Sequence, residues 1–190
     1  MATYPHWQYF LTLDNDLQRL SRYIEIDAAN YDVYSVELVR ILLAASSEID
    51  VVAKLLCSKL GTQPTKARGN WTMDDSRPVI VSGYPLLPTL NVTIPAHGIT
   101  LLPWGDWQQR KNPDWWRRHN AVKHDRSRAY HDANLGNVLH AVAGLYVLTL
   151  YLYGEEDHEG KLFPGVQTFA LEDEYMSNIL VSGSKKLPGV

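Results

Sequence analysis

The sequence predicts one mainly α-helical domain that contains an inserted β segment. Apolar residues recur every three to four positions in four separate stretches, which is the spacing of amphipathic helices. Residues 61–112 interrupt this pattern with closely spaced prolines and glycines around short apolar runs. The chain of 190 residues is 45% hydrophobic, which is enough for one core. We therefore expect a single domain over residues 1–190, with an insertion at 61–112 and a short C-terminal extension at 155–190.

The two stretches before the insertion predict two helices. The first covers residues 6–27, where apolar side chains repeat with a period of about 3.5 residues. After a short break a longer helix runs to about Leu60, and either Asp32 or Ser35 can cap its N-terminus. Gly61 is placed to end this helix, as a glycine just past the last turn does.

The insertion predicts short strands rather than helices. Runs of β-forming residues lie at 78–81, 90–94 and 99–102, each bounded by proline or glycine. The same segment carries Trp104 and Trp107. We expect these large apolar rings to pack the insertion back against the helices.

Helical spacing resumes after the insertion. Pro113 suits the first position of a third helix, with Asn112 as its N-cap, and this helix is expected to reach about Arg128. A fourth helix, residues 133–153, is the most hydrophobic. Because polar residues interrupt this stretch, its pattern predicts a central bundle helix and not a membrane span. No contact with a membrane is therefore expected.

The C-terminal extension begins with an acidic run and then has two short apolar runs, at residues 168–171 and 178–181. These two runs can pair as a hairpin. Alternatively, they can cover the insertion.

Composition excludes several classes of function. The net charge of −3 argues against a general nucleic-acid coat protein, although residues 106–131 carry a local excess of Arg and Lys over Asp. The single cysteine, Cys57, excludes an intramolecular disulfide and a zinc site built from several thiolates. We expect neither a metal site nor a cofactor. The N-terminus lacks the pattern of a signal peptide, so a cytoplasmic protein is expected.

Residues 113–131 concentrate side chains that suit chemistry on a phosphodiester. On a helix Arg117, Asn120 and His124 share one face, whereas Arg118 lies about 120° from His124. Cleavage of RNA by its 2′-OH needs a proton acceptor, a proton donor and a positive charge on the phosphate. Histidine can take both proton roles near neutral pH, and arginine binds phosphate with two N–H groups. One histidine is few for two proton transfers, and a symmetric dimer would supply a second.

The same stretch resembles the signature of HEPN domains, in which four to six residues separate an Arg from a following His. Both Arg118 and Arg117 stand at such a spacing from His124. The phrase Trp115-Trp116 followed by Asn120-Ala121-Val122-Lys123-His124-Asp125-Arg126 is similar to a motif of small bacterial HEPN-like proteins, "WW…YN-x-VKH-x-R". His119 stands where that motif has Tyr. The similarity covers residues 8–60 and 113–154.

The resemblance implies an up-and-down bundle of four to five helices. Many HEPN proteins are metal-independent endoribonucleases that act as dimers in toxin–antitoxin, phage-defence or RNA-processing systems. The resemblance implies that His124 is general acid and base, that Arg118 or Arg117 binds the scissile phosphate, and that Asn120 and Lys123 assist. The side chains expected to contact RNA are His119, Lys123, Arg126, Arg128 and Tyr130. The partners it implies are RNA, a second copy of the chain, and an antitoxin or other neutralising protein.

Other interpretations of these residues remain open. Some HEPN proteins have lost activity, so the alternative is a catalytically inactive module for dimerisation or for binding RNA or protein. His124 can be a structural histidine between helices, and the basic residues after it can form a solvated face. The adjacent tryptophans 115–116 are more typical of a core than of base stacking. Glu48 and Asp50 can fix Arg118 or His124 inside the bundle.

Overall fold

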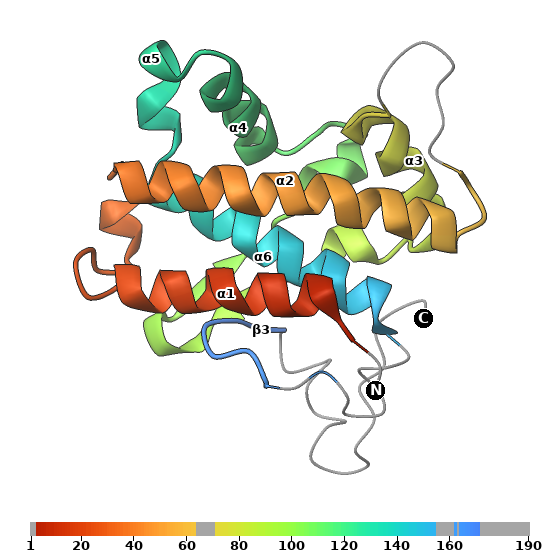
Figure 1. Cartoon of the computed structure of the whole chain (residues 1–190), viewed down its shortest axis with the longest axis horizontal. Helices are drawn as coiled ribbons and strands as arrows, with labels where there is room; N and C mark the ends of the chain where they lie inside the picture. Colours follow the sequence, from red (N-terminus) through yellow and green to blue (C-terminus); the bar gives the residue numbers. More distant parts are fainter. Residues whose placement is uncertain (1–2, 64–70, 155–161, 163, 172–190) are drawn as a thin grey trace.

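The computed structural model describes residues 3–63, 71–154, 162 and 164–171 (Figure 1). The protein is mainly helical and has one small antiparallel sheet, as the sequence predicts. The α-helices are α1 (Pro5–Leu20), α2 (Val36–Lys59), α3 (Met73–Gly83), α4 (Asp114–His124), α5 (Arg126–Ala129) and α6 (Leu135–Leu152). The strands are β1 (Val92–Ile94), β2 (Ile99–Leu101) and β3 (Ala170–Leu171), in the sheet order β2-β1-β3.

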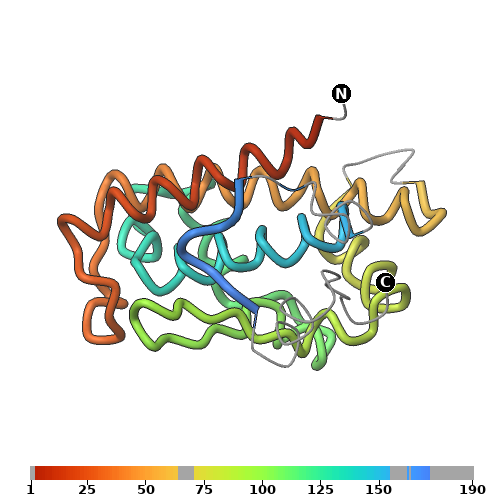
Figure 2. Tube along the Cα trace, turned by 90° about the horizontal axis from the view of Figure 1, so that it is seen from below, coloured from red at the N-terminus to blue at the C-terminus, as the bar shows by residue number. Residues whose placement is uncertain are grey.

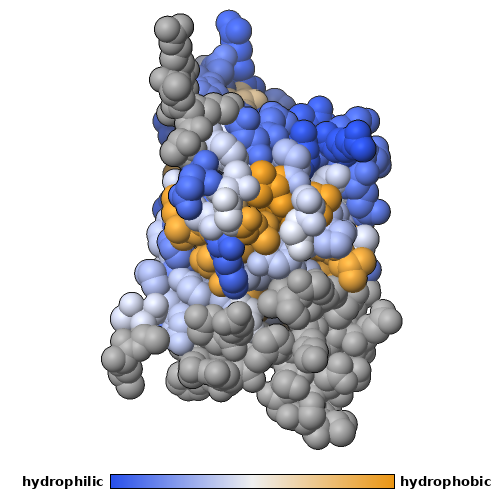
Figure 3. All heavy atoms as spheres, turned by 90° about the vertical axis from the view of Figure 1, so that its right-hand side faces the viewer, coloured by the Kyte–Doolittle hydropathy of each residue, from blue (hydrophilic) through white to orange (hydrophobic). Residues whose placement is uncertain are grey.

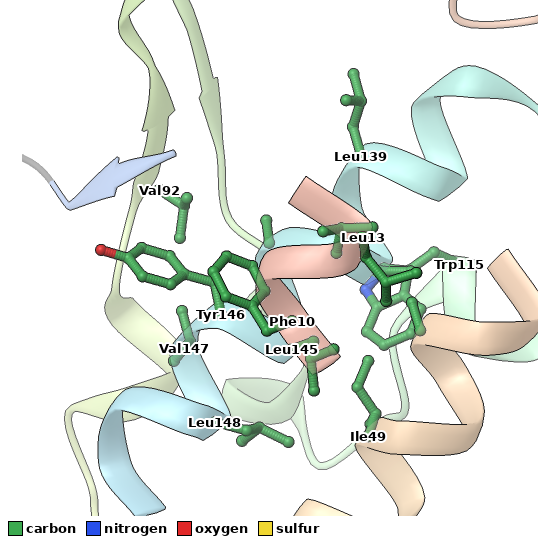
Figure 4. Packing of buried hydrophobic residues seen from close by; sticks show 14 of the residues in the cluster. Phe10, Leu13, Ile49, Val92, Trp115, Leu139, Leu145, Tyr146, Val147 and Leu148 are labelled. Carbon is green, nitrogen blue, oxygen red and sulfur yellow. The ribbon is translucent and has the colours of Figure 1, made fainter. Parts of the chain in front are cut away.

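Two layers cover α6 on opposite sides. α1 and α2 run side by side in opposite directions and form one layer (Figure 1). The insertion with its β1–β2 hairpin lies on the other side of α6 (Figure 2). The core between the helices is built from apolar side chains of all three, among them Phe10, Leu13, Ile49, Leu145 and Leu148 (Figure 4). This burial of apolar surface supplies the main driving force for folding.

α6 is the central helix of the domain. By length and composition it resembles a membrane span, but 83% of its residues are buried inside the domain, as in a core helix. Gly144 lets the insertion approach α6 closely, because a Cβ there would lie 3.2 Å from the ring of Trp104 and 3.3 Å from that of Trp115. Trp104 Nε1 donates a hydrogen bond to the Gly144 carbonyl at 3.1 Å. Trp107 is also buried, so the expectation that Trp104 and Trp107 pack the insertion on the helices is confirmed.

The segment between α1 and α2 closes the N-terminus of α6. The Leu135 N–H donates to the Val33 carbonyl at 2.9 Å. The Asn134 side chain caps the helix by accepting the Asn137 N–H at 3.0 Å. These bonds satisfy N–H groups that have no partner within the helix. They also fix the start of α6 beside α4.

α2 has the ends that the sequence predicts, whereas α1 starts within one residue of its predicted start but ends earlier than predicted. Ser35 Oγ accepts a backbone N–H of the first turn of α2 at 3.2 Å. Gly61 ends α2 with a left-handed φ of 80°. α1 ends at Leu20 and not near residue 27, and Asp27 caps a separate short 3-10 turn by accepting a backbone N–H.

The insertion contains a helix that the sequence analysis missed. Residues 78–81, expected as a strand, lie in α3. Thr72 and Asp75 start this helix with a capping box, in which the Thr72 N–H donates to the Asp75 carboxylate at 2.9 Å. The strands expected at 90–94 and 99–102 are present in shorter form as β1 and β2.

The C-terminal extension covers the insertion, which was one of the two expectations for it. β3 pairs with β1, with Val92 opposite Leu171. The buried Asp14 of α1 holds this segment, because its carboxylate accepts the N–H of Gln167 at 2.9 Å and that of Thr168 at 3.2 Å. The second apolar run, residues 178–181, lies outside the described residues.

The predicted third helix is divided into two. α4 begins at Asp114 with Pro113 as its N-cap residue. Asn112 does not cap it, because its side chain bonds to side chains of α3. α4 ends at His124, since Asp125 leaves the helical region with φ −144° and ψ 66°, and α5 follows.

Apolar residues reach the surface at the end of the molecule where α3 and the last turns of α2 lie. Figure 3 shows hydrophobic residues gathered in the middle of this face, with hydrophilic residues above them. The predicted site residues belong instead to α4 and to the chain just after it, at the upper left of Figure 1. This apolar face is therefore separate from the candidate site.

Candidate functional site

α4 is attached to the domain by four buried side chains: Trp115, Trp116, His119 and Val122. The ring centroid of Trp115 lies 5.2 Å from that of Trp104, and the centroid of Trp116 lies 5.7 Å from that of Trp115. The interpretation of the two adjacent tryptophans as core residues is confirmed. Because this aromatic packing fixes one face of α4, the polar side chains of the helix lie on its flanks and its outer face.

Arg118 is held on one flank of α4 by two carboxylates. Its Nε donates to Asp114 at 2.6 Å and its NH1 group to Asp132 at 2.5 Å. These hydrogen bonds, to Asp114 first and then to Asp132, raise the pKa of the guanidinium above its ordinary value. Arg118 therefore ties α4 to the turn that precedes α6, and its charge is already compensated.

Arg117 and His124 lie on the outer face of α4. The two residues are seven positions apart in the sequence. At 100° per residue, this separation places them within about 20° of each other around the helix and about 10 Å apart along its axis. Ala121 lies between them on the same strip and adds only a methyl group. Arg117 is 68% exposed and has one exposed ion pair, with Asp114 at 2.7 Å. Among the described residues, no hydrogen bond or ion pair holds the His124 ring, which is exposed.

A groove of about 670 Å³ separates α4 from α2 and from the start of α3. Four predicted site residues of α4 line this groove: His119, Asn120, Lys123 and His124. Lys123 is exposed and makes no ion pair within the described part of the chain. The groove thus combines a histidine, an amide and a free ammonium group along one edge.

His119 lies at the bottom of this groove and is only 5% exposed. Burial lowers its pKa to about 4, and the nearby positive charges of Lys123 and His124 act in the same direction. Its Nδ1 lies 3.2 Å from the Trp116 carbonyl, which can only accept a hydrogen bond. Nδ1 therefore carries the proton, and the neutral ring keeps a lone pair on Nε2.

The other predicted RNA-binding residues lie beyond α4. Arg126 and Arg128 are exposed on α5, and Arg128 Nε is 3.6 Å from the Asp125 carboxylate. The Tyr130 ring packs edge-on against Tyr34, with centroids 5.6 Å apart. None of these three predicted residues lines the groove.

A smaller cleft of about 430 Å³ lies on the other flank of α4 and is lined by Arg118, His131 and His140. His140 Nδ1 donates to the Gly136 carbonyl at 2.8 Å, and burial lowers the pKa of its ring. Arg118 and His124 therefore face different hollows of the same molecule.

The suggestion that Glu48 and Asp50 hold Arg118 or His124 is wrong. Glu48 pairs with His6 at 2.5 Å, and Asp50 pairs with Lys54 at 2.5 Å. Within the described residues, no group of three or more His, Cys, Asp or Glu side chains is placed to hold a metal ion.

Sequence reasoning missed several residues of the groove, among them Ser46 and Trp71. Ser46 is a buried hydroxyl of α2, and Trp71 is a half-buried ring just before α3. No signal in the sequence singles out Ser46, because a serine in an apolar helix is common. Trp71 lies three residues after Ala67-Arg68 in a polar stretch, where a lone tryptophan indicates a packing contact but not its partner.

Comparison with known proteins adds no relative: no protein-family model, no curated protein and no solved structure matches this chain.

Proposed function

We propose that the protein is a HEPN-like, metal-independent endoribonuclease. His124 transfers protons and Arg117 binds the scissile phosphate. The observation that carries the proposal is the outer strip of α4, where Arg117 and His124 are both exposed, with Ala121 between them. Because His124 has no partner among the described residues, its ring is free to contact RNA. Lys123 and Asn120, on the adjoining edge, assist in binding the phosphate and the sugar.

The geometry favours Arg117 over Arg118 as the phosphate ligand. Arg117 gives up only one exposed ion pair to bind phosphate, and such a pair contributes about 1 kcal/mol or less. Arg118 would have to leave two carboxylates, and it lies about 120° around the helix from His124. Arg118 is therefore assigned a structural role.

The reaction needs two proton transfers, and a homodimer supplies them. His124 of one copy accepts the proton of the 2′-OH, whose oxygen attacks phosphorus. His124 of the other copy protonates the 5′-oxygen, so that the P–O5′ bond breaks and a 2′,3′-cyclic phosphate remains. A two-fold axis over the outer strip of α4 would place two Arg117 and two His124 side chains at one phosphodiester. A toxin or phage-defence role would add a neutralising protein.

The test is incubation of the full chain with a mixed RNA pool in EDTA. We expect fragments with cyclic-phosphate ends, and we expect both His124→Ala and Arg117→Ala to lower the rate by at least about 100-fold. His97→Ala is the matched control, because His97 lies in the turn between β1 and β2 of the insertion and not on α4. Absence of cleavage by an intact dimer would refute the proposal of a nuclease. The alternative, a catalytically inactive module for dimerisation or binding, would then be favoured.

A further inference from the structure

Ser46, in the α2 wall of the groove between α2 and α4, carries a buried hydroxyl. The side chain is 1% exposed and lines the groove, and its Oγ has no hydrogen-bond partner among the described residues. A buried hydroxyl without a partner costs about 1–3 kcal/mol. A group that enters the groove and bonds to Ser46 would recover this free energy.

His119 supplies a second polar atom at the same depth. Its Nδ1–H is directed at the backbone of α4, so Nε2, on the other edge of the ring, is directed away from that backbone. Within the described part of the chain Nε2 has no partner. Ser46 can donate or accept, whereas the neutral His119 ring offers only an acceptor. Both residues line the same groove, and their two polar atoms together suit a ligand carrying an N–H group.

Apolar and aromatic side chains line part of the same groove. Trp71 is half-buried, and its ring is held in place because Nε1 donates to Ser76 Oγ at 2.7 Å. Met73 and Leu43 complete the apolar lining. A fixed indole ring can stack on a planar ring without further ordering of the side chain.

Positive charge lies at the rim of the groove, above the apolar walls. Lys123 has no ion pair among the described residues, and His124 is beside it. Lys54 is also at the rim but is neutralised by Asp50 at 2.5 Å. The rim therefore carries one uncompensated cation at the end of α4, next to the proposed reaction site.

These features point to a binding pocket for one nucleobase. The base stacks on Trp71, its N–H edge meets Ser46 Oγ and His119 Nε2, and its phosphate lies at Lys123. The inference rests on the proposed function in that the base belongs to the RNA bound at His124. It adds that a nucleotide beside the scissile bond leaves the RNA strand and enters the groove, so that the protein acts on unpaired RNA.

The test measures binding of the four nucleoside 5′-monophosphates to the full-length His124→Ala protein, by tryptophan fluorescence and calorimetry. We expect at least one to bind in the millimolar range or better, and Ser46→Ala to weaken it about fivefold to tenfold. Ser46→Ala removes only an unpaired hydroxyl, so the variant is expected to be at least as stable as the wild type. Ser58→Ala is the matched control, because Ser58 lies on the same helix with its hydroxyl bonded to the Lys54 carbonyl.

The outcomes separate this inference from the nuclease. Nucleotide binding that is weakened by Ser46→Ala and unchanged by Ser58→Ala supports the pocket, whether or not the wild-type protein cleaves RNA. Equal binding to both serine variants, or no binding at 10 mM (a concentration about tenfold above a millimolar Kd), overturns the pocket. If the wild-type protein still cleaves RNA in that case, the nuclease proposal stands without it.

Discussion

Lowering the pH from 7 to 5 is expected to destabilise the fold by about 2 kcal/mol through His119 alone. The ring is buried and neutral, and its pKa falls from the ordinary 6.5 to about 4. Between these two values the unfolded chain binds a proton that the folded protein excludes. Stability is therefore complete above pH 6.5 and is lost as the pH falls toward 4. The linkage relation for these two pKa values gives the 2 kcal/mol at pH 5.

Burial is the largest influence on the pKa of His119, and it outweighs the hydrogen bond to the Trp116 carbonyl, which favours the charged ring. Lys123 and His124 disfavour a charged ring, while Asp50 favours it but acts more weakly than burial. His140 has a lowered pKa for the same reason, burial, and contributes in the same direction. The effect of His119 must therefore be isolated by substitution rather than read from the wild-type protein alone.

The assay is urea unfolding at pH 7, 6 and 5 for the wild type and for His119→Asn. The asparagine amide can keep the donor to the Trp116 carbonyl but does not titrate. We expect the wild type to lose about 2 kcal/mol more than the variant between pH 7 and 5, while His131→Asn, an exposed control, follows the wild type. His119→Tyr gives a second non-titrating variant. Equal pH dependence in wild type and both His119 variants would show that the ring is not kept neutral by burial.

Three further predictions concern single contacts. Asp14→Ala should lower the free energy of unfolding by about 2–3 kcal/mol, seen in urea titrations, because it leaves the N–H groups of Gln167 and Thr168 without their acceptor; an unchanged midpoint would mean that the extension does not contribute to stability. Gly144→Ala should cost about 1–3 kcal/mol and change the tryptophan fluorescence, because its methyl group crowds the rings of Trp104 and Trp115. Arg118→Ala should reduce RNA cleavage much less than Arg117→Ala while lowering the melting temperature, and the reverse order would overturn the roles assigned to the two arginines.

The parts of the fold that the sequence predicts well are those with local causes. Ser35 and Gly61 mark the ends of α2, because a side-chain cap and a left-handed glycine act within one turn of the helix. The apolar pattern of α1 continues to Ile24, yet the helix stops at Leu20. Ile24 still packs against the core, although it lies in a turn after the helix. Its place in the apolar pattern therefore indicates that the side chain is buried and does not indicate that the residue is helical.

α3 stands where a strand was predicted, because the prediction rested on the apolar run at 78–81 and not on the residues before it. Residues 78–81 contain β-branched side chains after a proline, which favours a strand. The capping box formed by Thr72 and Asp75 lies only a few residues earlier and determines the result. Helix-start signals upstream of an apolar run therefore outweigh the composition of the run itself.

The candidate site could be predicted only as far as helix geometry reaches. The shared face of Arg117 and His124 follows from 100° per residue. Helix geometry does not predict the two carboxylates that bind Arg118, because Asp132 follows α5 and lies outside the helix that carries Arg118. Helix geometry also does not predict the unpaired hydroxyl of Ser46, since that depends on which elements pack against α2. Contacts between distant parts of the chain decide these features.

Asp114 connects the two arginines and explains why only one of them is available to a ligand. One oxygen of its carboxylate accepts from Arg117 and the other from Arg118. When a phosphate takes Arg117, Asp114 keeps Arg118, which also keeps Asp132, so no carboxylate is left without a partner. If a phosphate took Arg118 instead, Asp132, which is only 13% exposed, would lose its cation. The arrangement of charges therefore directs an anionic ligand toward the strip shared by Arg117 and His124.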